Sequence, residues 1–182
     1  MKPLIIANWK MNPTSGQAAR ALFRGSRRSL AGVRGVEVAI APPFPYLGLA
    51  RARRVFQLAA QDVFWEANGS YTGEVSPIML KDLGVRYVLI GHSERRRILG
   101  ERGEAISRKV HAVIRAGMVP VLAIGEDRRE SEEVVPKTLS LQLSEALAGV
   151  PRRAVKGIVI AYEPIWAIST TPGAKPATVD HA

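Results

Sequence analysis

Four residues of this 182-residue sequence have side chains suited to removing a proton from a carbon next to a carbonyl group: Asn8, Lys10, His92 and Glu163. A carboxylate takes such a proton, while an imidazole, an amide and an ammonium group stabilise the charge that develops on the oxygen atoms. Glu163 is the expected base and His92 the expected electrophile, with Asn8 and Lys10 as nearby donor and cation. Pro164 favours an extended backbone at Glu163, which continues the direction of the preceding residues. These residue types predict an enolisation site.

Each of these residues closely follows a short apolar run that is typical of a β-strand. Six such runs are expected, at residues 4–7, 37–41, 58–61, 87–90, 119–124 and 157–162. Several are apolar nearly throughout, as in strands of a parallel sheet that is covered on both faces. The carboxyl ends of parallel strands share one face, so the four side chains are expected to converge there.

Helical patterns fill the segments between the expected strands. Apolar residues recur at helical spacing before Gly117 and again before Gly149, and glycine is a common helix stop. This alternation predicts an α/β domain with either an open doubly wound sheet or a closed barrel. The phosphate-binding motifs G-x-G-x-x-G after the first strand and G-x-x-x-x-G-K-[ST] are absent. No repeat or linker interrupts the chain, so one domain over residues 1–182 is predicted.

The formal net charge of +10 raises the possibility of an acidic partner, either nucleic acid or a small phosphorylated substrate. Four arginines fall on one stripe of an expected helix, opposite a face that Ala21 and Leu22 are expected to bury: Arg20, Arg24, Arg27 and Arg28. No aromatic residues lie among them to stack on bases, so a nucleic-acid partner is not expected.

The absence of cysteine excludes disulfides, thiolate metal ligands and a cysteine nucleophile. No apolar run is long enough for a signal peptide or for the ~20 residues of a membrane span. A cytoplasmic protein without a membrane partner is therefore expected.

Four motifs resemble those of triosephosphate isomerases in sequence, order and spacing: Asn8-Trp9-Lys10-Met11-Asn12, Tyr71-Thr72-Gly73-Glu74, Gly91-His92-Ser93-Glu94-Arg95-Arg96 and Tyr162-Glu163-Pro164-Ile165-Trp166-Ala167-Ile168. The resemblance spans nearly the whole chain. It implies an incomplete TIM (β/α)8 barrel of about six parallel βα units. It also implies interconversion of dihydroxyacetone phosphate and glyceraldehyde 3-phosphate, in glycolysis and gluconeogenesis, with no cofactor and no metal.

The resemblance also implies roles for individual residues. The catalytic residues would be Glu163, His92 and Lys10, and the substrate contacts Asn8, Lys10 and Ser169, with Ser93 and Glu94 as supporting residues. Thr72 would contact a neighbouring subunit. Ser93 and Glu94 also have a purely structural interpretation, as the N-cap and the first turn of a short helix.

The sequence departs from the family near its end. Residues 166–175 form a longer stretch than the family's lid, with Ser169 in place of a glycine and an added Pro172. A complete barrel takes about 250 residues, so strands 7 and 8 and their phosphate-binding loops are expected to be missing. Two alternatives to an active isomerase therefore stay open: an inactive or very weakly active relative, and a basic non-catalytic binding protein.

The expected edges of strands 1 and 6 bear on assembly. Unpaired strand edges with apolar neighbours such as Ile5, Ile158 and Ile160 favour association. A homo-oligomer, either a dimer or larger, is expected.

Overall fold

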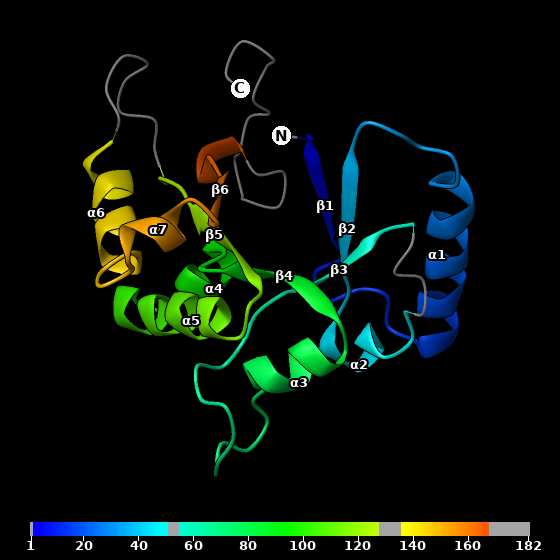
Figure 1. The fold of residues 1–182 in the computed structure, drawn as a ribbon, viewed down its shortest axis with the longest axis horizontal. Coiled ribbons are helices and arrows are strands. Elements are labelled where there is room, and N and C mark those ends of the chain that lie inside the picture. Colours follow the sequence, from blue (N-terminus) through cyan, green and yellow to red (C-terminus); the bar gives the residue numbers. More distant parts are fainter. Residues whose placement is uncertain (1, 51–54, 128–135, 168–182) are drawn as a thin grey trace. The chain divides into compact units, whose positions relative to one another are not determined.

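The structure is a computed structural model that describes residues 2–50, 55–127 and 136–167. Helices and strands alternate along the chain, as predicted (Figure 1). The strands are β1 (Leu4–Asn8), β2 (Glu37–Ala41), β3 (Gln57–Ala60), β4 (Val85–Ile90), β5 (Val119–Ile124) and β6 (Val159–Tyr162). The helices are α1 (Gly16–Ser29), α2 (Phe44–Leu47), α3 (Pro77–Asp82), α4 (Ser93–Ile98), α5 (Gly103–Arg115), α6 (Lys137–Ala146), α7 (Arg152–Val155) and the 3-10 helix η1 (Ile165–Ala167).

The order of the strands in the sheet follows their order in the chain, from β1 to β6. The pairs β1–β2, β2–β3, β3–β4 and β5–β6 are parallel. In an open doubly wound sheet the strand order reverses at a switch point, whereas a (β/α) barrel adds each new strand on the same side. The periodicity left both architectures open, and the observed order is that of the barrel.

The strand positions are predicted well in the middle of each run and less well at the ends. Strands β2 and β5 have the predicted bounds, whereas β4 begins two residues earlier, at Val85, directly after Gly84 closes the end of α3 at φ 76°. Strand β6 begins later than predicted, at Val159. The amides of Gly157 and Ile158 donate to carbonyls of α7, at 3.0 Å each, and are therefore not available to a sheet.

The chain forms two compact units. The first unit comprises Met1–Leu89 and Ala112–Pro120, and the second comprises Ile90–His111 and Val121–Ala182. Each unit has its own buried apolar residues, and each is described by itself below. The single domain over residues 1–182 remains a prediction.

In the first unit, α1 packs through its buried residues Ala19 and Phe23. Ser15 precedes the helix with extended backbone, and its Oγ accepts a hydrogen bond from the Ala18 amide at 3.2 Å, which satisfies one of the free amides of the first turn. The Phe23 ring lies 4.7 Å from the Trp9 ring and 6.1 Å from the Phe56 ring, between centroids. Burying a side chain of this size contributes about 2–3 kcal/mol to stability.

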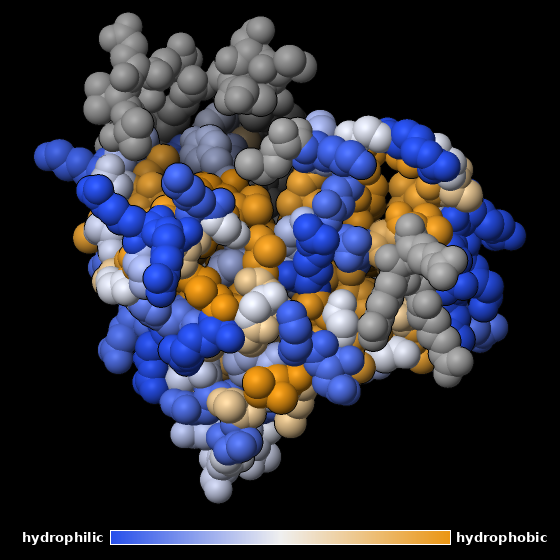
Figure 2. Space-filling model, in the orientation of Figure 1, coloured by the Kyte–Doolittle hydropathy of each residue, from blue (hydrophilic) through white to orange (hydrophobic). Residues whose placement is uncertain are grey.

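The predicted buried face of this helix was wrong. Ala21 and Leu22 are exposed, Leu22 by 47%, because α1 turns Ala19 and Phe23 toward the core instead. The arginine stripe is largely solvated, as expected: Arg20, Arg24 and Arg28 are exposed and Arg27 is half-buried. Hydrophilic side chains cover the outer side of α1 at the right of the view (Figure 2).

In the second unit, α5 buries Ile106 and Val110 completely. A charged cluster lies beside them. The Glu101 carboxylate receives Arg95 Nε at 2.7 Å and Lys109 Nζ at 2.8 Å, and the side chains of Glu101 and Lys109 are each only 5% exposed. Glu101 lies in the loop before α5, so its two ion pairs connect this loop to Arg95 of α4 and to Lys109 of α5. Removing one of the three side chains would leave a buried charge without compensation, which destabilises a fold.

Candidate functional site

The structure brings His92 and Glu163 together in the second unit. His92 follows β4 after a turn at Gly91, where φ is 72°, and Glu163 directly follows β6. Glu163 Oε1 lies 3.2 Å from His92 Nε2, and Glu163 Oε2 accepts a hydrogen bond from the Ser93 amide at 3.1 Å. The side chains of His92 and Glu163 are 13% and 21% exposed, so both are shielded yet reachable. A carboxylate and an imidazole in this arrangement are able to pass a proton to and from a small bound molecule.

Hydrogen bonding assigns the tautomer of His92. Its Nδ1 accepts a hydrogen bond from the Glu94 amide at 3.3 Å, so the proton of a neutral ring lies on Nε2. That Nε2–H points at the Glu163 carboxylate.

His92 is also the N-cap of α4, and this corrects the structural interpretation of Ser93. His92 has φ −51° and ψ 140°, and its ring accepts from the first turn, whereas Ser93 is the first helical residue and is 8% exposed. Glu94 lies in the first turn, as predicted, where an acid is locally favourable. The contribution of Ser93 to the site is its backbone amide, which donates to Glu163.

The backbone of Glu163 is held by β5. Its amide donates to the Ile124 carbonyl at 2.7 Å. Gly125 follows Ile124, and a Cβ atom at Gly125 would collide with the Glu163 carbonyl oxygen. Gln142 of α6 supports Gly125 from the other side, since its amide group donates to the Gly125 carbonyl at 2.9 Å and accepts from its amide at 3.0 Å.

We expect Gly125→Ala to destabilise the protein by about 1–3 kcal/mol, since the backbone of Glu163 must move to admit a methyl group. Thermal or urea unfolding measures this effect. Gly157→Ala is the matched control, because a Cβ atom there meets only the Ala154 carbonyl at an ordinary 3.4 Å. Equal stability of the two variants would contradict the close approach at Gly125.

Glu126 holds the residues on both sides of Glu163, and it is a site residue that the sequence did not predict. Its Oε1 accepts from the Tyr162 hydroxyl at 2.7 Å and from Trp166 Nε1 at 2.8 Å, while its carbonyl accepts from the Ile165 amide at 3.1 Å. Glu126 is 4% exposed. The signal available in the sequence was an acidic residue two positions after the apolar β5 run, behind Gly125.

The Arg96 side chain bonds both to the residue after β4 and to β5. Its Nε donates to the Gly91 carbonyl at 2.7 Å and its Nη2 donates to the Ala123 carbonyl at 3.2 Å. Burial lowers the pKa of this guanidinium, while the carboxylates of Glu101, Glu145 and Glu163 act in the opposite direction.

Asn8 and Lys10 form a second cluster, in the first unit. The backbone of Lys10 has a φ of 52°, which lies in the left-handed region that residues other than glycine rarely adopt. Two side-chain amides hold it there: Asn8 Oδ1 accepts from the Lys10 amide at 2.9 Å, and Gln61 Nε2 donates to the Lys10 carbonyl at 2.8 Å. Gln61 also donates to the Ala41 carbonyl at the end of β2, at 2.8 Å. Such strain is often kept at functional sites. The supporting role of Gln61 was not predictable from the sequence, because Gln61 lies 51 residues from Lys10.

Two further predicted site residues, Thr72 and Ser169, are not among the contacts described above. Thr72 is exposed in the segment between β3 and α3, where Phe64 and Tyr71 pack with ring centroids 4.6 Å apart. Ser169 lies outside the described residues, as does most of the expected lid.

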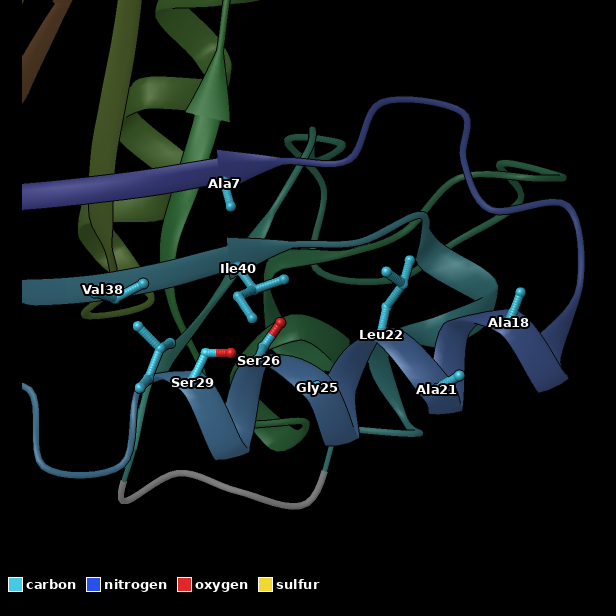
Figure 3. Close-up of a pocket in the computed structure, with 10 residues that line it drawn as sticks. Ala7, Ala18, Ala21, Leu22, Gly25, Ser26, Ser29, Val38 and Ile40 are labelled. Carbon is cyan, nitrogen blue, oxygen red and sulfur yellow. The ribbon is translucent and has the colours of Figure 1, made fainter.

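The first unit also has an apolar groove that holds none of the predicted site residues. It measures about 780 Å³ and runs between α1 and the strands β1 and β2. Leu22 and Gly25 of α1 face Ala7 and Ile40 across it (Figure 3). The residues that line it are apolar apart from two serines, and none of the lining residues is an acid or a base that could activate a serine. The groove therefore lacks the chemistry expected of an active site.

Two other classes of site receive no support from the described part of the chain. No group of three or more histidine, aspartate and glutamate side chains in residues 2–50, 55–127 and 136–167 is arranged to hold a metal ion. No helix within the same ranges is both long and apolar enough to cross a membrane.

Comparison with known proteins bears on the identity of these clusters. The family model described as triosephosphate isomerase matches residues 3–182. The triosephosphate isomerase of Carboxydothermus hydrogenoformans is 43% identical over 185 residues, which cover 100% of this chain and 72% of the relative. That of Citrifermentans bemidjiense is 44% identical over 174 residues, covering 93% of this chain and 68% of the relative.

A solved structure agrees with this result. The crystal structure of triosephosphate isomerase from Bartonella henselae has a TM-score of 0.79 and 34% sequence identity, and the match covers 91% of this chain and 69% of the other. The fold is thus that of an incomplete TIM (β/α)8 barrel with six parallel strands in the described residues.

Proposed function

The chain belongs to the triosephosphate isomerase family, whose members are intramolecular aldose–ketose isomerases, and we propose that it interconverts dihydroxyacetone phosphate and glyceraldehyde 3-phosphate. Such a reaction belongs to glycolysis and gluconeogenesis. It moves hydrogen between two adjacent carbon atoms with no net oxidation, and it therefore needs no cofactor.

The observation that carries the proposal is the pairing of Glu163 with His92. A carboxylate 3.2 Å from an imidazole Nε2, with a backbone amide on its second oxygen, is a base whose position is held by two donors. Both residues follow the carboxyl ends of strands, where sites in barrels of this kind are built.

The proposed reaction uses three side chains. The Glu163 carboxylate takes a proton from the carbon next to the substrate carbonyl, and the electron pair of that C–H bond moves to form an enediolate. The His92 Nε2–H donates to the substrate oxygen, and the Lys10 ammonium stabilises the negative charge. His92 passes a proton from the original hydroxyl oxygen to the former carbonyl oxygen, so that the first becomes the new carbonyl and the second the new hydroxyl as Glu163 returns its proton to the neighbouring carbon. The division of roles between a glutamate base and a neutral histidine is the known pattern of this family and is adopted from it.

Asn8, Lys10 and Ser169 are the proposed contacts of the phosphorylated triose, with Glu94 as a supporting residue. Lys10 is the best supported of these, because its strained backbone is held by two side-chain amides. Holding the lysine backbone in one conformation directs its ammonium group toward one position, which favours a charge-assisted hydrogen bond to a phosphorylated substrate.

The second proposed partner is another copy of the chain. Ile5 on β1 is 57% exposed and Ile160 on β6 is 45% exposed, and Thr72 lies in an exposed segment that is able to contact a neighbour. We expect a dimer or larger assembly. Light scattering measures it, and a stable monomer at micromolar concentration would contradict the expectation.

A coupled isomerase assay on the purified full chain, run in both directions, tests the proposed function. Conversion of glyceraldehyde 3-phosphate by the wild-type chain and by Arg24→Ala supports it, since Arg24 lies on the exposed face of α1. Absence of turnover in both, with the fold intact by circular dichroism, would leave a folded relative without activity.

A further inference from the structure

Arg96 connects the residue before His92, at the end of β4, with β5, the strand that holds the backbone of Glu163. Through Nε it bonds to the carbonyl of Gly91, the residue before His92. Through Nη2 it bonds to the carbonyl of Ala123, and the next carbonyl in that strand, of Ile124, accepts the amide of Glu163. The guanidinium group is rigid and planar, and it bonds to both carbonyls at once. It therefore fixes the distance between the backbone at Gly91 and the backbone at Ala123.

The surroundings of the guanidinium are shaped to receive it. A Cβ atom at Gly91 would lie 2.8 Å from Arg96 Nη2 and 3.2 Å from Ile106 Cδ1, so the glycine leaves the space that the arginine fills. The positive φ of Gly91 adds a second reason for glycine at this position.

Charge supports the same role. Burial lowers the pKa of Arg96, and the carboxylates of Glu101, Glu145 and Glu163, in decreasing order, act in the opposite direction. The flanking arginines of α4 differ: Arg95 bonds to Glu101, and Arg97 is exposed.

We propose that Arg96 is a positioning residue of the isomerase site, which holds the ends of β4 and β5 so that His92 Nε2 and the Glu163 carboxylate keep their working separation. The proposal rests on the proposed function of the same site. Arg96 acts through the backbone of Gly91 and Ala123, and it has no assigned contact with substrate.

Kinetics of three variants test this role. Arg96→Gln is expected to lower kcat about 10²-fold while KM changes less than about threefold, because a shift of about 1 Å between reacting groups costs that much without removing a substrate contact. Arg96→Lys should lie between this variant and wild type, since an ammonium keeps the charge but loses the planar two-armed bonding. Arg97→Gln is the matched control and should resemble wild type.

Chemical rescue separates positioning from general loss of structure. Methylguanidinium ion should restore part of the lost kcat in Arg96→Ala and none in Glu163→Gln. If Arg96→Ala does not fold, Arg96→Lys and Arg96→Gln still provide the kinetic test.

Amide exchange at Ser93 gives a readout that does not need activity, because the Ser93 amide donates to Glu163. In Arg96→Gln its protection should fall about tenfold relative to Val110 in the buried face of α5, and in Arg97→Gln it should not. A wild-type chain without turnover would defeat the proposed function, and the exchange result would then decide the role of Arg96 by itself. Unchanged Ser93 protection in Arg96→Gln would overturn the proposal, whether or not kcat falls.

Discussion

Replacing Glu163 by glutamine is expected to lower kcat about 10³-fold, because an amide has the shape of the carboxylate but does not take up a proton from carbon. Substrate binding should change little, since the side chain keeps its size and still accepts a hydrogen bond from the Ser93 amide. The loss should thus appear in kcat and in kcat/KM to the same extent. Steady-state kinetics with glyceraldehyde 3-phosphate measures both constants.

Glu104→Gln is the matched control for this change. Glu104 is an exposed acid in the first turn of α5, in the same unit as Glu163. It should retain activity within about threefold of wild type, as expected for an exposed charge. Comparable activity of Glu163→Gln and Glu104→Gln would remove Glu163 from the role of base.

The second large effect is expected at His92, where one ring serves two purposes. Its Nε2–H faces Glu163, and its Nδ1 caps α4 by accepting from the Glu94 amide. His92→Ala should therefore lose about 10²-fold or more in kcat and, through the lost cap, about 1 kcal/mol of stability. Kinetics and thermal unfolding of the same preparation measure the two losses.

His92→Asn separates the two purposes. Asparagine is among the best N-cap residues, so the variant should recover the stability that His92→Ala loses. It should not recover kcat, because its shorter side chain does not carry a donor to the position of Nε2. Recovery of full activity in His92→Asn would show that the ring acts only as a helix cap.

The sequence by itself was sufficient to predict the class of the fold and the order of its elements. Parallel strands that are covered on both faces must be apolar nearly throughout, and the runs at 37–41 and 119–124 have that pattern with the right bounds. The ends of strands were less predictable because they depend on which amides neighbouring turns use. The amides of Gly157 and Ile158 donate to carbonyls of α7, so these two residues do not pair with a neighbouring strand and β6 begins only after them.

The burial of α1 shows the same limit. Helical spacing indicated one polar and one apolar face, but Ala21 and Leu22 lie near the boundary between them. Small rotations of a helix change which residues face the core, and the contacts of Phe23 with Trp9 and Phe56 decide that rotation here. No local pattern contains those two aromatic partners.

For the site, the sequence by itself determined which chemistry is available. Residue types and strand-end positions predicted a carboxylate, an imidazole, an amide and an ammonium group, and the resemblance to the family is confirmed by relatives at 43–44% identity. Only the tertiary structure decided how these groups are held. His92, and not Ser93, caps α4. Gln61 holds the backbone of Lys10 in the first unit, and Glu126 and Arg96 make their own bonds in the second unit, all to residues far away in the chain. These partners become neighbours only when the chain folds and the ends of different strands come close together. A hydrogen bond between residues far apart in the chain does not produce a repeating pattern in the sequence, so it was not predictable from the sequence.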